Sequence, residues 1–320
     1  MPEPSFTWEA TTPLWRRLLP WLIGAICIAA LLAAIDLEAV AASLQRARLG
    51  TFALLAFAFV IVLCLIEAAN LDDLLRVFGH KRPYPEVLAA RAYTYLLMLL
   101  NYALGVAGFG LYVRNRAAVS AARASSLMLY YAHCEMLALC VLTLLGAAAF
   151  LDEPVLRSVA LAAIVYLVGS QVLLRLLASG RLPYGQSLRA SSLLSCLLNS
   201  GAARTWRIAA GRAGYFAVFI LFIALTLPSF GLDVPLPVLA ATVPAIFLIG
   251  NLPVTAAGLG TIQAAMLYFF APFGDYSDIL AYGVCYSAAL IVFRIPLGVL
   301  GAMAYPGLWQ RLGPTQASPH

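Results

Sequence analysis

Two decapeptides decide the predicted fold: NYALGVAGFG at residues 101–110 and NLPVTAAGLG at residues 251–260. Both follow the pattern Asn-x6-Gly-x-Gly with an alanine before the first glycine of the pair, and they stand 150 positions apart in a chain of 320 residues. Each interrupts an apolar run, and unbroken apolar runs precede and follow it. Paired Gly- or Pro-interrupted hydrophobic segments in two halves of a chain indicate the binding site of a transporter.

The composition excludes a soluble protein. Hydrophobic residues make up 63% of the chain, charged residues only 11%, and the mean hydropathy is +0.92. Soluble domains carry about 25% charged residues, and a disordered chain is polar rather than apolar throughout. A membrane span takes about 20 residues, so no stretch is left for a soluble catalytic domain. We therefore expect a single integral membrane domain over residues 1–320.

The apolar runs predict an all-α polytopic membrane protein. Six unbroken runs are expected to cross the membrane fully, at about 14–35, 51–71, 125–150, 155–177, 213–232 and 279–304. The two Gly-broken runs, 92–111 and 236–273, are expected to form re-entrant hairpins that enter and leave on one side. The pseudo-repeat halves are then about 51–150 and 213–304. A basic loop of about 178–212 links them, and its middle is predicted to form a short interfacial helix.

The charge pattern predicts the orientation. Lys and Arg collect in cytoplasmic loops, and with a cytoplasmic N-terminus the six crossings leave only Arg46, Arg48 and Arg157 outside, with Arg294 inside the membrane. If both broken runs crossed fully, the basic loop at 178–212 would fall outside instead. The hairpins thus enter from opposite sides, as in an inverted repeat. The Arg-, Ala- and Leu-rich composition is typical of a GC-rich bacterial genome, so we expect the bacterial inner membrane with both termini cytoplasmic.

The glycine pairs are expected to meet near the midplane. Irregular backbone occurs at membrane depth only where protein covers it or where it lines a water-filled cavity. Helices that start after Gly110 and Gly260 would direct backbone N–H groups inward and favour an anion. In a bilayer the obvious anion is a lipid phosphate.

At GLGTIQAAM (258–266) the chain resembles the lysylphosphatidylglycerol synthase transmembrane-region family, the flippase-like membrane domain of multiple-peptide-resistance-factor proteins. Pro253 and Gly258-Leu259-Gly260 match its C-terminal pattern, where Gln263 replaces a glutamate. Asn101, Gly110 and Arg114 match its N-terminal pattern, where Leu111 replaces a glutamate and a proline is missing. The resemblance covers about 50–305 and implies a lipid-translocating or lipid-binding domain. The two missing carboxylates weaken any proton-coupled mechanism, and the absent aminoacyl-transferring domain means that synthase activity is not implied.

Each candidate residue has a second interpretation. The Gly108/Gly110 and Gly258/Gly260 pairs form a substrate gate or simply allow close helix packing. Asn101 and Asn251 bind a headgroup or cap helix ends. Intramembrane charge is costly and functional by default, so Arg294 binds phosphate, or instead pairs with Glu135 or a carbonyl. Glu135 carries a proton or pairs with an arginine, and Arg114 binds phosphate or lies at the interface.

Four further residues receive structural interpretations. His133 is expected to be a hydrogen-bonded histidine of the helix bundle, and Glu67 is expected to reach the membrane interface. The pair Asp72-Asp73 is expected to be solvated, and no HExxH, GxSxG or DDxxD motif accompanies it.

Lipid translocation through a midplane cavity is therefore the first functional hypothesis, with an anionic or lipid-linked substrate. The alternative is a non-catalytic, lipid-binding accessory subunit of a cell-envelope system, with a homo-oligomer or an envelope enzyme as partner. We expect no enzymatic activity, no nucleic-acid partner and no cofactor. We also expect no metal, because the six cysteines lack metal-ligand spacing.

Overall fold

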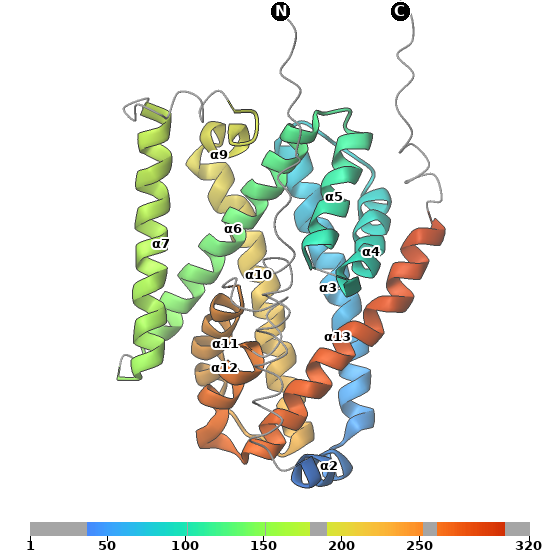
Figure 1. The fold of residues 1–320 in the computed structure, drawn as a ribbon, viewed down its shortest axis with the longest axis vertical. Coiled ribbons are helices and arrows are strands. Elements are labelled where there is room, and N and C mark those ends of the chain that lie inside the picture. The colour runs from blue at the N-terminus through green and yellow to red at the C-terminus, as the bar shows by residue number, and fades with distance from the viewer. Residues whose placement is uncertain (1–36, 101, 151, 180–190, 252–260, 305–320) are drawn as a thin grey trace, which may run out of the picture.

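Five long helices dominate the computed structural model of the chain, in which every regular element among the described residues is helical (Figure 1). The described residues are 37–100, 102–150, 152–179, 191–251 and 261–304. The helices long and apolar enough to cross a membrane are α3 (Leu49–Val77), α6 (Ala121–Ala147), α7 (Pro154–Ser179), α10 (Ala202–Thr226) with its 3-10 extension η1 (Leu227–Phe230), and α13 (Tyr276–Ala304). The expected all-α, multi-pass membrane protein is confirmed at this level. The predicted first crossing, about 14–35, lies outside the described residues.

Two pairs of shorter helices stand between the long ones. They are α4 (Tyr84–Leu100) with α5 (Tyr102–Arg116), and α11 (Leu236–Gly250) with α12 (Thr261–Phe270), which the 3-10 helix η3 (Ala271–Phe273) follows. At 1.5 Å per residue these helices are about 15–26 Å long, less than the ~30 Å hydrocarbon core of a bilayer. In Figure 1, α4 and α5 occupy the upper half of the molecule, whereas α11 and α12 occupy the lower half.

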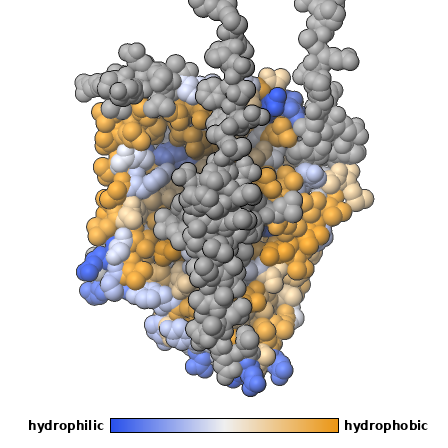
Figure 2. Space-filling view, viewed as in Figure 1, coloured by the Kyte–Doolittle hydropathy of each residue, from blue (hydrophilic) through white to orange (hydrophobic). Residues whose placement is uncertain are grey.

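The connections segregate by charge to the two ends of the molecule. The α3–α4 and α5–α6 connections and the short helix α9 (Ser195–Asn199) lie at the upper end in Figure 1, with the basic residues Lys81, Arg82 and Arg116. The α6–α7, α10–α11 and α12–α13 connections and the helix α2 (Leu37–Arg46) lie at the lower end, with Asp152, Asp233 and Asp275. Figure 2 shows hydrophobic side chains over the flanks between these ends.

The first glycine pair does not break its helix. Helix α5 runs continuously from Tyr102 to Arg116, so the predicted helix start after Gly110 is wrong. A Cβ on Gly105 would lie 2.2 Å from Met98 Cγ, and one on Gly108 would lie 2.3 Å from Leu97 Cδ1. These glycines thus let α5 pack closely on α4, and the helix continues because an open backbone at membrane depth would leave polar groups unpaired.

The basic segment 178–212 is only partly a loop. Helix α10 begins at Ala202, eleven residues before the predicted start at 213, so Arg204, Arg207 and Arg212 are helical. The predicted short helix is present as α9. It is fixed to the start of α6, where Ser126 Oγ accepts a 2.9 Å hydrogen bond from the Cys196 N–H and Arg123 donates a 2.8 Å hydrogen bond to Ser195.

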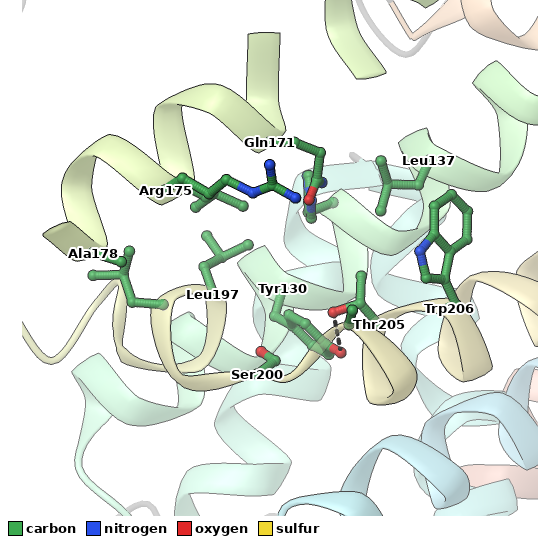
Figure 3. Close-up of a pocket in the computed structure, with 13 residues that line it drawn as sticks. Tyr130, Leu137, Gln171, Arg175, Ala178, Leu197, Ser200, Thr205 and Trp206 are labelled. Atoms are coloured by element: carbon green, nitrogen blue, oxygen red, sulfur yellow. Dashed lines mark hydrogen bonds between the residues drawn. The ribbon is translucent and has the colours of Figure 1, made fainter. Parts of the chain in front are cut away.

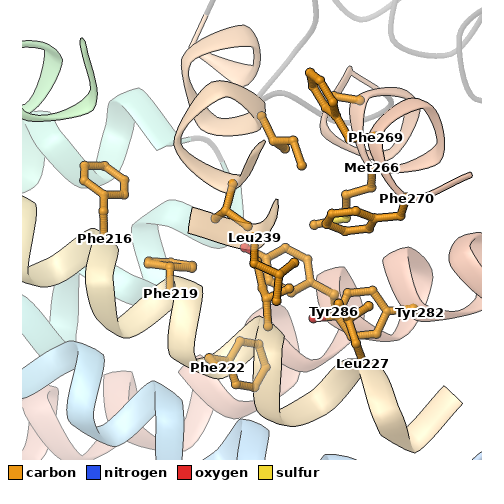
Figure 4. Close-up of a cluster of buried hydrophobic side chains, with 14 of the residues drawn as sticks. Phe216, Phe219, Phe222, Leu227, Leu239, Met266, Phe269, Phe270, Tyr282 and Tyr286 are labelled. Carbon is orange, nitrogen blue, oxygen red and sulfur yellow. The ribbon is translucent and has the colours of Figure 1, made fainter. Parts of the chain in front are cut away.

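The largest apolar core joins α10, α11, α12 and α13 (Figure 4). Phe216, Phe219 and Phe222 project from α10 toward Leu239 of α11 and the aromatic side chains of α12 and α13. Phe222 stacks on Phe59 of α3 with ring centroids 4.0 Å apart. Lipid is as apolar as these side chains, so close packing rather than water exclusion holds the helices together.

Helix α13 makes its most extensive helix contact with α4. A Cβ on Gly301 would lie 2.7 Å from both the Ala89 carbonyl oxygen and the Tyr93 nitrogen, so only a glycine fits between the two backbones without movement. Gly298, one turn earlier, faces the Leu96 side chain, whose Cγ would lie 2.5 Å from a Cβ at that position. This close contact brings Arg294 of α13 to the face of α4 that carries Tyr95.

Candidate functional site

Five charged residues from five different helices lie close together inside the molecule: Glu67 of α3, Arg91 of α4, Glu135 of α6, Arg212 of α10 and Arg294 of α13. We call these five residues the charge cluster. Glu67, Arg91 and Arg212 are buried, and Glu135 and Arg294 are partly buried. Charged side chains inside a membrane protein are expensive and mark functional positions by default.

Glu67 and Arg91 form a bidentate ion pair. Arg91 donates from Nε to Glu67 Oε2 at 2.9 Å and from NH2 to Oε1 at 2.6 Å. Tyr95, one turn after Arg91, donates its hydroxyl to Oε2 at 2.8 Å. The geometry is that of the strongest class of protein hydrogen bonds. It contradicts the prediction that Glu67 reaches the membrane interface.

Arg212 is the most enclosed member of the charge cluster. Only 1% of its surface is exposed, and it is one of the largest fully buried side chains. Its NH2 lies 2.9 Å from Glu135 Oε2, and its NH1 donates to the Tyr131 hydroxyl at 3.1 Å. The guanidinium also lies 3.9 Å from the ring centroid of Tyr215. Such a cation–π contact is strongest where water is excluded. Glu135 therefore pairs with an arginine, as one of its two interpretations predicted, but that arginine is Arg212 and not Arg294.

A glycine places Arg212. A Cβ on the preceding residue, Gly211, would lie 2.4 Å from Oδ1 of Asn70 in α3. Asn70 donates instead from Nδ2 to the Gly211 carbonyl at 3.1 Å. The sequence Gly211-Arg212 therefore lets α10 approach α3 closely and fixes the guanidinium beside α6.

Arg294 has no carboxylate partner among the described residues. Its guanidinium lies 5.0 Å from the Tyr95 ring centroid, and Arg91 lies 5.2 Å from the same ring. Its Nε is buried without a hydrogen-bond partner, as is the Nε of Arg212. Both Arg212 and Arg294 interact electrostatically with the Glu67 carboxylate.

The charge cluster therefore holds three guanidiniums against two carboxylates. One positive charge is left over, together with two unused N–H donors. Arginine N–H groups match the oxygens of phosphates and carboxylates in geometry. Chemically, this arrangement can stabilise an anion inside the protein.

Other predicted site residues are placed as follows. Gln263 of α12 donates from Nε2 to Ser287 Oγ of α13 at 2.8 Å. Ser287 precedes Arg294 by seven positions and so shares its helix face. Asn251 is exposed at the C-cap of α11, and its N–H bonds to the Phe247 carbonyl at 2.9 Å, which favours the capping interpretation.

Gly110 packs against α6, since a Cβ there would lie 3.4 Å from Met128 Cγ. With Gly108 it therefore serves helix packing. Arg114 is exposed in the last turn of α5 and is not part of the charge cluster. Asn101, Pro253, Gly258 and Gly260 lie outside the described residues.

Sequence reasoning missed Arg91 and Arg212 because each stands beside a loop that contains other basic residues. A usable signal exists, since both have small residues on either side, in AARAY and AGRAG. Small neighbours allow close helix approach, which suits a charge that must be covered by protein.

Two cavities lie away from the charge cluster. One of about 210 Å³ lies between α6, α7, α9 and α10, with His133, Arg175 and Trp206 in its lining. The other, of about 380 Å³, lies between α7, α11 and α12 and is mostly apolar, although Tyr268 there donates a 2.6 Å hydrogen bond to Glu153. Among the described residues, no group of three His, Cys, Asp or Glu side chains is placed to hold a metal ion.

Comparison with known proteins adds no relative. No protein-family model matches the chain, and no curated protein matches it either.

Proposed function

We propose that the protein moves an anionic phospholipid, or a lipid-linked anionic substrate, between the leaflets of the bacterial inner membrane, without covalent chemistry. In this proposal α4–α5 and α11–α12 are re-entrant hairpins that enter from opposite sides, and the two halves form an inverted repeat. The order of elements supports this. A long helix, two short helices and a long helix occur as α3–α4–α5–α6 and again as α10–α11–α12–α13, with the short pairs in opposite halves of the molecule (Figure 1).

The observation that carries the proposal is the excess of guanidinium in the charge cluster. Arg212 lies ten residues after the start of α10, while Glu67 and Arg294 lie ten residues before the ends of α3 and α13. Each is therefore about 15 Å from a helix end, half the thickness of a ~30 Å hydrocarbon core. A surplus cation at mid-depth costs about 3 kcal/mol or more, and a passing phosphate group would neutralise it.

The test is transport in vesicles. Protein reconstituted in phosphatidylcholine vesicles with fluorescently labelled phosphatidylglycerol is exposed to membrane-impermeant dithionite, which destroys only the outer-leaflet label. We expect wild-type protein to expose the inner-leaflet label, and Arg294→Gln to slow this at least about tenfold, because a charge-assisted hydrogen bond is worth about 1.5–3 kcal/mol.

The matched control is Arg157→Gln, which removes an exposed arginine near the lower end of α7. This variant should transport as the wild type does. Transport no faster than in empty vesicles, across several lipid classes, would contradict the proposal.

One observation favours the accessory-subunit alternative. Both carboxylates of the charge cluster are paired with arginines, and Gln263 stands where the resembling family has a glutamate. A protein without an unpaired carboxylate there is poorly equipped for proton coupling, which leaves passive movement or lipid binding alone. Copurification of one stoichiometric envelope protein, with no transport by the isolated chain, would select this alternative.

A further inference from the structure

The 210 Å³ cavity is formed because α6 and α7 diverge. The two helices meet near their shared connection at the lower end and separate toward the upper end, where α9 lies between them (Figure 1). Nearby side chains of α7, including Val172, Leu173 and Leu176, are exposed and apolar, as expected of a lipid-facing helix.

Polar groups line this cavity although its surroundings are apolar. Figure 3 shows Gln171 and Arg175 of α7 facing Tyr130 of α6 and Thr205 of α10. No side-chain hydrogen bond or ion pair joins Gln171 or Arg175 to another described residue. His133, also in the lining, shares a 2.9 Å hydrogen bond between its Nδ1 and the Tyr166 hydroxyl, while its buried Nε2 has no partner.

We propose that this cavity binds the phosphate group of an anionic phospholipid from the leaflet at the α9 end, with Arg175 as its charged partner and Gln171 and His133 as further hydrogen-bond partners. The proposal rests on the proposed function, for which it supplies the site where the lipid is first bound. A volume of about 210 Å³ far exceeds that needed for one water, so a phosphate group fits with hydration. The diverging helices leave its acyl chains in the bilayer.

The cavity lies on the same two helices as the Arg212–Glu135 ion pair. Tyr130 donates its hydroxyl to Thr205 at 3.2 Å, which links α6 and α10 at the cavity wall. Thr205 precedes Arg212 by seven residues, which is two helical turns and about 10 Å on the same face of α10. A headgroup bound in the cavity is therefore separated from the charge cluster by this Tyr130–Thr205 contact.

Trp206 provides the reporter, because it lines the cavity and is the one tryptophan among the described residues. In a variant whose other four tryptophans are phenylalanine, its fluorescence is measured in vesicles that contain dibrominated phosphatidylglycerol or dibrominated phosphatidylcholine. Bromine quenches on contact, so quenching reports which lipid occupies the cavity. We expect phosphatidylglycerol to be preferred about tenfold, the value of one charge-assisted hydrogen bond.

Arg175→Gln should abolish this preference, and Arg157→Gln, at the other end of the same helix, should retain it. Arg175 is exposed, so its substitution leaves the packing intact. Equal quenching by the two lipids in the wild-type cavity, or an unchanged preference in Arg175→Gln, would overturn the proposal. Transport that persists without any lipid preference at Trp206 would reject this site and leave the proposed function standing.

A second arm separates lipid from free phosphate. Inorganic phosphate is titrated into the protein in neutral detergent that contains no anionic lipid. No saturable change in Trp206 fluorescence is expected, because the site depends on the lipid. A saturable change that is lost in Arg175→Gln would assign the cavity to a soluble phosphate compound and overturn the assignment to a lipid.

Discussion

At the level of single residues, Tyr95 links the Glu67–Arg91 ion pair to Arg294. Its hydroxyl donates to Glu67, while its ring lies 5.2 Å from Arg91 and 5.0 Å from Arg294. One side chain thus stabilises a carboxylate through its edge and two cations through its face, as the charge distribution of an aromatic ring permits. Arg294 can remain inside the protein without a carboxylate of its own because Tyr95 partly compensates it.

Breaking the Glu67–Arg91 ion pair should be more harmful than removing it. Glu67→Gln leaves the Arg91 guanidinium without its carboxylate and raises the surplus positive charge of the cluster from one to two. The expected loss is about 3–5 kcal/mol in the free energy of unfolding, measured by titration with SDS in mixed micelles.

The double variant Glu67→Gln/Arg91→Met restores the original balance of charge and should recover most of that loss. If the double variant is as unstable as Glu67→Gln alone, the uncompensated charge is not the cause of the instability.

Among the elements, the long helices were predictable, but the start of α10 was not. Apolar runs at 51–71, 125–150, 155–177 and 279–304 correspond to α3, α6, α7 and α13, because a membrane span depends on local composition. The start of α10 was missed because Arg204, Arg207 and Arg212 resemble a basic loop in sequence. Whether such an arginine is buried depends on a partner from another helix, here Glu135 for Arg212, and hydropathy cannot identify that partner.

The glycines of the first broken run show the same limit. Their spacing predicts a break in the helix, yet Gly105 and Gly108 lie inside a continuous helix and accommodate side chains of α4. Glycine serves both purposes in membrane proteins, and only the neighbouring helix distinguishes them.

The contact between α13 and α4 is expected to tolerate no side chain at Gly301. In Gly301→Ala the new methyl group would meet backbone atoms of Ala89 and Tyr93 at 2.7 Å, which cannot rotate away. Overpacking of this kind costs about 1–3 kcal/mol, so the variant should unfold at lower SDS concentration. It should also slow lipid movement, because α13 carries Arg294.

Gly169→Ala is the matched control, since a Cβ there has no atom within 4 Å and the residue lies inside α7. Its stability should be unchanged or slightly raised, because alanine favours a helix over glycine. Equal effects of the two substitutions would show that α13 and α4 are not held together by this close approach.

The whole molecule combines two features that a simple helix bundle does not need: short helices in opposite halves, and a charge cluster that takes one residue from each of five helices. Each short pair packs against a long helix that carries an arginine of the cluster, since α4 contacts α13 and α11 contacts α10. A movement of either short pair would therefore alter the surroundings of the cluster. Coupling of this kind suits a site that must be reached from the two membrane surfaces in turn.

The proposed entry of the two short helix pairs from opposite sides of the membrane predicts a labelling pattern at the scale of the whole molecule. Lys81 and Ala118 flank α4–α5, Asp233 and Asp275 flank α11–α12, and all four are exposed. A single cysteine is introduced at each of these positions. The native cysteines among the described residues compete little for the reagent, because they are buried or partly buried. In intact cells a membrane-impermeant maleimide should label Asp233→Cys and Asp275→Cys but reach Lys81→Cys and Ala118→Cys only after the membrane is opened, because basic ends remain cytoplasmic. If the two flanks of either pair label from different sides, that pair crosses the membrane and the inverted arrangement is wrong.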